Sequence, residues 1–289
     1  MCASQAGYRS RRIAAQDGLM LAYRDYPGPA QGATPVVCLP GLSRNAKDFE
    51  QVAERLAASR RVLCPDYRGR GRSDYDGDWR NYTPVTYLGD LRQVFAAAGI
   101  HGAVFVGTSL GGILVMGLGV LAPTVVRGAV LNDAGPDVDT DGLQRILELV
   151  GHDRAQPDWD QAVALCRQHY AQLGFEDDER WRRFAEATFR QGDDGLLHVD
   201  WDTRIVEPLR RSTATPDLWP LFRSLRHVPL LAVRGASSDI LAERTLQRMK
   251  SAHPDLATHT VDGVGHAPSL EEPETEKAID DLLQRIDNG

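Results

Sequence analysis

Short apolar runs alternate along the chain with segments in which apolar residues recur every three or four positions. The runs are rich in β-branched residues and have the length of strands buried on both faces of a parallel sheet. They cover residues 35–39, 61–66, 103–106, 128–131 and 229–235. The segments between them, among them 46–58, 84–98 and 242–251, have the spacing of amphipathic helices. This alternation predicts an α/β protein whose mainly parallel sheet is covered by helices on both faces.

Both ends of the chain add elements to this pattern. Residues 8–15 and 19–26 flank the turn Asp17-Gly18 and are predicted to form two short strands. Near the C-terminus a last strand is expected close to 258–261. Ser269 is predicted to cap a final helix that carries Glu271 and Glu272 in its first turn.

The alternation stops between about residues 138 and 225. This part of the chain is helical in pattern, charged, and holds four of the five tryptophans. We therefore predict a core formed by residues 1–136 and 226–289, with residues 137–225 inserted as a helical cap. The cap aromatics either pack a small core of their own or face an apolar substrate.

The sequence Gly107-Thr108-Ser109-Leu110-Gly111 lies between an apolar strand and an apolar helix. Strand, sharp turn and helix are the context in which G-x-S-x-G forms a nucleophile elbow. Small residues beside the serine allow the strained turn and the close approach of strand and helix. Ser109 is therefore the candidate nucleophile.

A serine hydroxyl needs a base to take its proton and a third group to orient that base. His266 follows the last predicted strand on a glycine-flanked loop, where the chain order Ser…Asp/Glu…His requires the base. Two acids, Asp133 and Asp239, each follow an apolar strand and lie between Ser109 and His266. Chain order alone leaves both open as the orienting acid.

An oxyanion hole requires two backbone N–H groups directed at the developing negative charge. Leu110, directly after the serine, is predicted to supply one. Leu42, in the loop Pro40-Gly41-Leu42 after a buried strand, is predicted to supply the other. Arg44 in the same loop is a candidate contact for a substrate carboxylate, although a loop-bracing role is an alternative.

Composition and charge exclude several other classes of protein. The 289 residues carry a formal net charge of −7 and no long basic run, which disfavours a nucleic-acid partner. No stretch has the length of a membrane span or a signal peptide, so we expect no membrane partner and a cytoplasmic location. The four cysteines are scattered, no metal-ligand spacing occurs, and G-x-G-x-x-G is not satisfied at 69–74. No metal or cofactor is expected.

Taken together, the motifs resemble those of the α/β-hydrolase fold superfamily. They are Leu39-Pro40-Gly41-Leu42, the stretch Asp66 to Ser73, Gly107 to Gly112, Arg234 to Asp239, and Gly265-His266-Ala267-Pro268. The resemblance implies a mostly parallel eight-stranded sheet with a helical cap inserted after the sixth strand. It also implies that Asp239, after the penultimate strand, is the triad acid. One departure is Leu39-Pro40-Gly41-Leu42, where many relatives carry His-Gly.

The resemblance implies a serine hydrolase that acts on a carboxylic ester or lactone of a small, apolar substrate. Ser109 at the nucleophile position disfavours dehalogenases and epoxide hydrolases, which use aspartate there. A carbon–carbon bond hydrolase of ring-cleavage products is the alternative within enzymes, and Arg44 would then hold the substrate carboxylate. A non-catalytic small-molecule receptor on the same fold is the alternative outside them.

Overall fold

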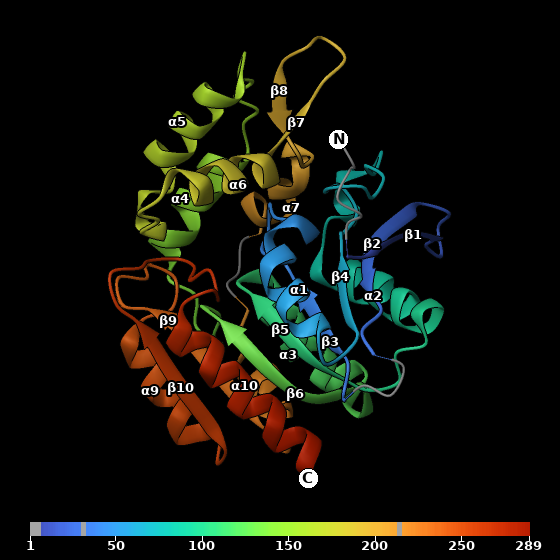
Figure 1. Cartoon of the computed structure of the whole chain (residues 1–289), viewed down its shortest axis with the longest axis vertical. Coiled ribbons are helices and arrows are strands. Elements are labelled where there is room, and N and C mark those ends of the chain that lie inside the picture. The colour runs from blue at the N-terminus through green and yellow to red at the C-terminus, as the bar shows by residue number, and fades with distance from the viewer. Residues whose placement is uncertain (1–6, 30–32, 213–215) are drawn as a thin grey trace.

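An eight-stranded sheet forms the centre of the computed structural model, which describes residues 7–29, 33–212 and 216–289. Its strand order is β1-β2-β4-β3-β5-β6-β9-β10 (Figure 1). Strand β2 pairs antiparallel with both β1 and β4, and all other neighbouring strands of this sheet are parallel. The strands are β1 (Arg9–Ala14), β2 (Met20–Tyr26), β3 (Val36–Leu39), β4 (Val62–Pro65), β5 (Ala103–Thr108), β6 (Val126–Asn132), β9 (Leu230–Gly235) and β10 (Leu256–Val261). The predicted fold class is confirmed.

Side chains of the central strands alternate between two apolar layers, as the period of two residues in a strand requires. In β3, Val36 and Cys38 belong to one layer, whereas Val37 and Leu39 belong to the other. The first layer is covered by α1 (Glu50–Ala57) and α10 (Pro273–Asn288). The second is covered by α2 (Pro84–Ala98), α3 (Leu110–Leu121), α8 (Trp219–Ser224) and α9 (Glu243–Ala252). Because both faces are covered, the central strands are apolar along their whole length.

The chain between β6 and β9 leaves the sheet and forms a layer of helices above its carboxyl edge (Figure 1). It contains α4 (Thr140–Val150), α5 (Trp159–His169), α6 (Asp178–Thr188), α7 (Glu207–Arg210) and the hairpin of β7 (Phe189–Gln191) with β8 (Leu197–Val199). Short 3₁₀ turns occur in this segment at Ala171–Leu173 and Thr203–Val206, and in the core at Ala46–Phe49, Trp79–Asn81 and Pro123–Val125. The last helix of the segment, α8, packs instead against α3, and Ser224 Oγ donates to the Met116 carbonyl at 3.3 Å.

Tryptophans of the inserted segment serve mainly its internal packing. Trp181 is buried among Phe175 and Phe184, and Trp201 donates through its indole N–H to the Val150 carbonyl at 2.9 Å. Trp219 is buried on α8. These contacts favour the packing alternative for the tryptophans.

The prediction for the final helix is wrong in its start. Helix α10 begins at Pro273, and Ser269 does not cap it. The Ser269 N–H and hydroxyl both donate to the Glu272 carboxylate, at 3.0 and 2.8 Å. The physical reason is Pro273, because a proline suits the first helical position and holds the residue before it outside the helical region.

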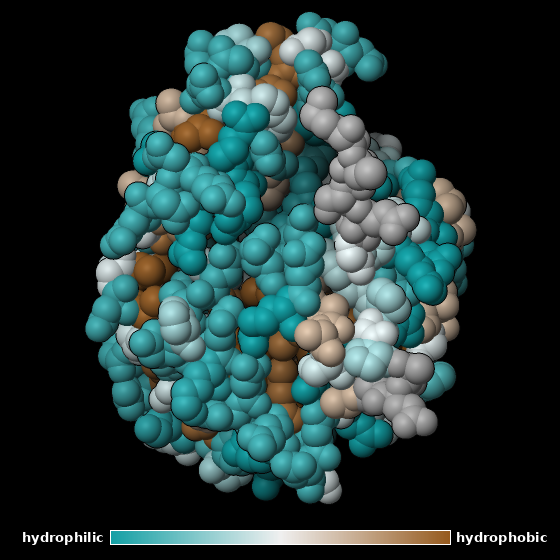
Figure 2. Space-filling view, viewed as in Figure 1, coloured by the Kyte–Doolittle hydropathy of each residue, from teal (hydrophilic) through white to brown (hydrophobic). Residues whose placement is uncertain are grey.

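The face shown in Figure 2 is mostly hydrophilic, with hydrophobic residues in separate places. No helix in the described part of the chain combines the length and apolarity needed to cross a membrane. Cys38, Cys64 and Cys166 are buried free thiols, as expected for scattered cysteines in apolar segments. Cys2 lies outside the described residues.

Candidate active site

Ser109 sits on a sharp turn between β5 and α3. Its φ of 52° and ψ of −114° place it in a conformation that non-glycine residues rarely adopt. A Cβ at Gly107 would lie 2.6 Å from the Gly111 backbone, and one at Gly111 would lie 2.0 Å from the Leu39 carbonyl oxygen. Both glycines are therefore required by the close approach of strand and helix, as the sequence predicted.

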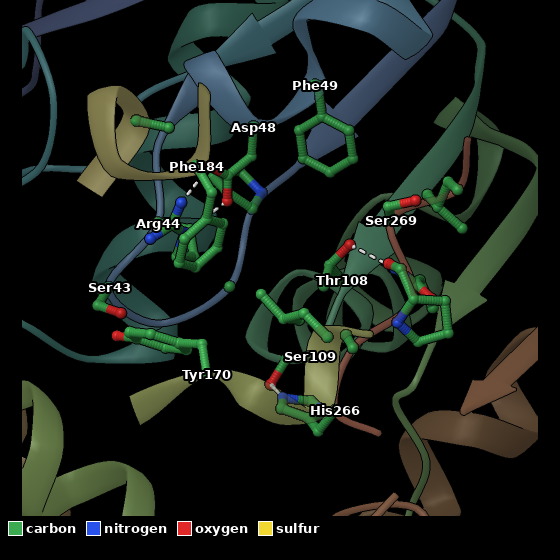
Figure 3. A pocket seen from close by; sticks show the side chains of 18 of the residues that line it. Ser43, Arg44, Asp48, Phe49, Thr108, Ser109, Tyr170, Phe184, His266 and Ser269 are labelled. Carbon is green, nitrogen blue, oxygen red and sulfur yellow. Dashed lines mark hydrogen bonds and ion pairs between the residues drawn. The ribbon is translucent and has the colours of Figure 1, made fainter. Parts of the chain in front are cut away.

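The His266 ring joins two side chains that are far apart in the sequence. Its Nε2 lies 3.0 Å from Ser109 Oγ, and its Nδ1 lies 2.7 Å from Asp133 Oδ2. Figure 3 shows the Ser109 hydroxyl meeting the His266 ring at the cavity wall. In this geometry Nδ1–H donates to the carboxylate, which leaves Nε2 as the acceptor for the serine proton.

Asp133 is fully buried at the end of β6, where its carboxylate is held by three donors. Oδ1 accepts from the Gly235 N–H at 3.0 Å. Oδ2 accepts from Ser238 Oγ at 2.5 Å in addition to the His266 ring. A buried charge with satisfied hydrogen bonds is costly to move, so this carboxylate is fixed in place.

The prediction that Asp239 orients His266 is wrong. Its side chain is 42% exposed and forms an ion pair with Arg145 of α4, with 2.7 Å between Arg145 Nη2 and Asp239 Oδ2. The hydroxyl of the preceding residue, Ser238, contacts Asp133 instead. Because β6 and β9 are adjacent and parallel, both acids emerge at the same edge of the sheet, and the Asp133 carboxylate is the one that lies beside the ring.

Two supporting residues were not identified from the sequence. Ser238 donates to Asp133 while its oxygen accepts from the N–H groups of Ile240 and Leu241, at 3.1 and 3.0 Å. Asn132 donates to Thr108 Oγ1 at 3.1 Å and to the Pro268 carbonyl at 2.9 Å. It thus ties the strand before the serine to the loop of the histidine. A polar residue at the end of an apolar strand was the available signal.

The two predicted oxyanion donors flank the serine. Leu110 is the first residue of α3, where N–H groups have no intrahelical partner. Leu42 lines the cavity, and a Cβ built on Gly41 would lie 3.8 Å from Ser109 Cβ, so the loop passes close to the serine. The fully buried Arg70 donates through Nε to the Leu42 carbonyl at 2.8 Å and thereby fixes this loop.

A cavity of about 400 Å³ opens above Ser109 and His266. Its walls come from the loop after β3, the start of α1, the loop of the histidine, and α4 and α6 of the inserted segment. The apolar part of the wall includes Phe49, Ile146, Leu149, Val150, Leu173, Phe175 and Phe184. This volume and lining are typical of a site for a small organic molecule.

Arg44 reaches the cavity wall, but its charge is already paired. Its Nε and Nη2 both donate to the Asp48 carboxylate at 2.6 Å, and its Nη1 donates to Thr188 Oγ1 at 2.7 Å. The guanidinium also lies over the Phe184 ring, 4.2 Å from its centre (Figure 3). This arrangement favours the loop-bracing alternative over a contact with a substrate carboxylate.

Burial changes the charge behaviour of two groups in the wall. It raises the pKa of Tyr170 to about 12, so the phenol is neutral and can donate a hydrogen bond at ordinary pH. Burial also raises the pKa of Glu271, against the opposing charges of Arg180 and Arg183.

Within residues 7–29, 33–212 and 216–289, no group of three or more His, Cys, Asp or Glu side chains is arranged to hold a metal ion.

The family model of the alpha/beta hydrolases matches residues 36–276, so the chain belongs to this family. It is 33% identical over 264 residues to the 3-hydroxybutyrate-oligomer hydrolase of Cupriavidus necator. The matched region covers 88% of this chain and 89% of that one. It is 27% identical to the 2-(acetamidomethylene)succinate hydrolase of Mesorhizobium japonicum, over 84% of this chain and 85% of that one. The crystal structure of an alpha/beta hydrolase from Novosphingobium aromaticivorans superposes with a TM-score of 0.92 at 42% identity, covering 98% and 100% of the two chains.

Proposed function

We propose that the protein is a serine hydrolase that cleaves a carboxylic ester or lactone of a small molecule. The observation that carries the proposal is the series Ser109, His266 and Asp133, joined by hydrogen bonds of 3.0 and 2.7 Å at the floor of a largely apolar cavity. A serine, a histidine and a buried carboxylate in this order perform acyl transfer on several unrelated folds.

In the proposed reaction His266 takes the Ser109 proton as the serine oxygen attacks the substrate carbonyl. The N–H groups of Leu42 and Leu110 stabilise the resulting oxyanion. Collapse of this intermediate breaks the bond to the alcohol, which receives its proton from His266 and leaves. A water molecule, deprotonated by His266, then attacks the acyl-serine; the bond to Ser109 Oγ breaks, His266 returns the proton to this oxygen, and the carboxylic acid leaves. Asp133 orients the ring and stabilises the imidazolium that forms in both steps.

The choice of an ester is supported by the Cupriavidus necator relative, whose substrate is an oligomer of 3-hydroxybutyrate. Short linear esters of hydroxy acids suit a cavity of about 400 Å³. Carbon–carbon bond cleavage is the second candidate, since it uses the same three residues. It ranks second because, of the two relatives, the one with the greater identity to this chain is the 3-hydroxybutyrate-oligomer hydrolase of Cupriavidus necator.

The test is steady-state turnover on matched substrates by the wild-type protein and Ser109→Ala. The substrates are nitrophenyl esters of increasing chain length, several lactones, linear 3-hydroxybutyrate oligomers and a ring-cleavage dienoate. We expect ester or lactone turnover that is lost in Ser109→Ala. Turnover of the dienoate alone would assign carbon–carbon cleavage instead. Ligand binding without product from any substrate would assign a receptor.

The identity of the acid is tested by comparing Asp133→Asn with Asp239→Asn. We expect Asp133→Asn to lower kcat roughly 10³- to 10⁴-fold, because an amide carries no charge to stabilise the imidazolium and its NH2 group can donate to Nδ1, which favours the wrong tautomer. Asp239→Asn is expected to lower kcat far less, since its carboxylate contacts Arg145. The reverse order of effects would return the role to Asp239.

A further inference from the structure

Arg145 of α4 lines the cavity above Ser109, and its hydrogen-bonding capacity is only partly used. Its Nε and Nη2 lie 2.8 and 2.7 Å from a single oxygen, Asp239 Oδ2. Its side chain is 40% exposed, and its Nη1 has no protein partner among the described residues. A guanidinium has five N–H donors, so several remain for a ligand.

The loop that supports the triad acid also fixes the position of Arg145. A Cβ at Gly142 would lie 2.1 Å from the Asp239 carbonyl oxygen, so the first turn of α4 is in direct contact with this loop. Arg145 is three residues further along and lies on the same face of the helix. Asp239 itself follows Ser238, whose hydroxyl contacts Asp133. The Arg145–Asp239 ion pair therefore lies next to the candidate catalytic centre.

The other arginines of the cavity wall suit an anion less well, for two different reasons: Arg44 lacks free donors, and carboxylates outnumber the guanidinium groups around Arg180 and Arg183. Arg44 is held by both oxygens of Asp48 and by Thr188. Arg180 and Arg183 share Glu271, at 3.7 and 3.2 Å. They have further carboxylate partners in Asp177 and Glu179, at 3.6 and 3.4 Å, so three carboxylates balance two guanidinium groups there.

We propose that Arg145, oriented by Asp239, binds a free carboxylate of the substrate and makes the protein selective for anionic esters of hydroxy acids. The proposal rests on the proposed ester hydrolysis. A linear hydroxy-acid oligomer ends in a carboxylate close to its last ester bond, and a guanidinium binds such a group through two parallel hydrogen bonds. The neighbouring Ile146, Leu149 and Val150 give this wall apolar surface beside the guanidinium, which suits the hydrocarbon part of such a substrate.

The test compares two substrates that differ in one group, the linear dimer of 3-hydroxybutyrate and the same dimer with its carboxylate converted to a primary amide. Arg145→Met is expected to raise KM for the acid roughly ten- to a hundredfold, the usual effect of losing hydrogen bonds to a charged group, and to leave the amide unaffected. Arg145→Lys keeps the charge without the paired donors and is expected to fall between. Asp239→Asn is expected to change KM for the acid more than kcat.

The matched control is Arg167→Met. Arg167 lies on α5 outside the cavity, is 41% exposed and pairs with Asp178, so it resembles Arg145 in exposure and pairing. We expect it to change neither substrate. Equal losses on the acid and the amide in Arg145→Met would overturn the proposal. A selective loss in Arg183→Met, with none in Arg145→Met, would overturn it as well.

A binding measurement separates this proposal from the proposed function. Calorimetry on Ser109→Ala measures the affinity for both dimers without turnover. Tighter binding of the acid, lost when Arg145→Met is added, would support the carboxylate site even if the wild-type protein hydrolysed neither dimer and the ester proposal failed. Equal affinity for both dimers would overturn the carboxylate site whatever the turnover.

Discussion

At the scale of single residues, the choice between two acids depends on a few ångströms. Asp133 and Asp239 both follow strands whose carboxyl ends lie side by side in the sheet. Asp133 lies beside the His266 ring, whereas Asp239 turns to α4 and pairs with Arg145. Ser238 separates the two environments, because its hydroxyl donates to Asp133 and its backbone leads to Asp239.

Ser238→Ala tests this positioning contact. The Ser238 oxygen accepts two backbone N–H groups, so its single proton is directed at the Asp133 carboxylate. Removing it is expected to lower kcat roughly ten- to a hundredfold, the value of a hydrogen bond to a charged group, while KM stays the same. Ser238→Thr keeps the hydroxyl and should recover the rate.

Steady-state kinetics on one ester substrate make the measurement. The control is Ser237→Ala, because the Ser237 side chain is exposed beside the same loop. If the Ser238→Ala protein had lower stability but full kcat, the contact between Ser238 and Asp133 would only support the fold.

At the scale of elements, the strand–turn–helix unit from β5 to α3 depends on the absence of side chains at two glycines. A Cβ at Gly111 would overlap the Leu39 carbonyl of β3, and backbone cannot move away as a flexible side chain can. The Ser109 N–H of this unit also donates to the Asn132 carbonyl of β6 at 2.9 Å. The strained serine is therefore held by its neighbours in the sheet.

Gly111→Ala is expected to destabilise the protein by about 3 kcal/mol or more, because the new methyl group must displace β3 or α3. The matched control is Gly89→Ala in α2, where an added Cβ has no heavy atom within 4 Å. That substitution should stabilise the protein by roughly 0.5–1 kcal/mol, since alanine is the better helix former. Urea unfolding of both variants provides the measurement, and equal effects would contradict the steric argument.

At the scale of the whole molecule, the inserted segment is joined to the core along the loop after β4. The Gly71 N–H donates to the Asp200 carbonyl at 3.0 Å, and the Asp202 N–H donates to the Gly69 carbonyl at 2.8 Å. Asp66 begins this loop, and its carboxylate accepts from the Ala46 and Arg72 N–H groups, at 2.7 and 3.0 Å. The two backbone contacts join residues 200–202 of the inserted segment to the loop after β4, whereas α8 packs on the core.

Asp66 makes the stability of the folded protein depend on pH. Burial raises the pKa of Asp66 to about 6 from 3.8, partly opposed by its two backbone donors and assisted by the charge of Asp200. The folded protein thus binds a proton more tightly than the unfolded chain, and this contribution favours folding below about pH 4 and is lost as pH rises to about 6. We compare the free energy of unfolding of the wild type with that of Asp66→Asn. The wild-type value minus the variant value should fall by about 1–3 kcal/mol as the pH rises across this interval.

Chemical unfolding at several pH values from about 2 to 7 provides the measurement, so that it covers the intervals of both carboxylates. Asp78→Asn is the opposite-sign control, because hydrogen bonding to the Arg80 N–H lowers the pKa of Asp78. Its contribution is present above about pH 4 and is lost at lower pH. A wild-type minus Asp66→Asn difference that stayed constant from pH 4 to 7 would contradict the assignment.

The sequence alone determined the fold class, most element positions, and the placement of Ser109 and His266 in one site. These follow from local signals: strand runs of fixed length, helical spacing such as that of 84–98, and turn residues such as Gly107 and Gly111 that only one backbone geometry requires. Such signals act within a few residues along the chain, so they can be recognised without knowing the neighbours in space.

The tertiary structure decided which acid faces the histidine, that Arg44 is paired, and that Arg145 faces the cavity. It also decided that Ser238 and Asn132 support the site. Each of these depends on the distance between side chains from segments far apart in sequence. A carboxylate or a guanidinium binds whichever partner lies within about 3 Å of it, and that distance is set by the register of β6 against β9 and by the packing of α4, which residue type and spacing do not encode.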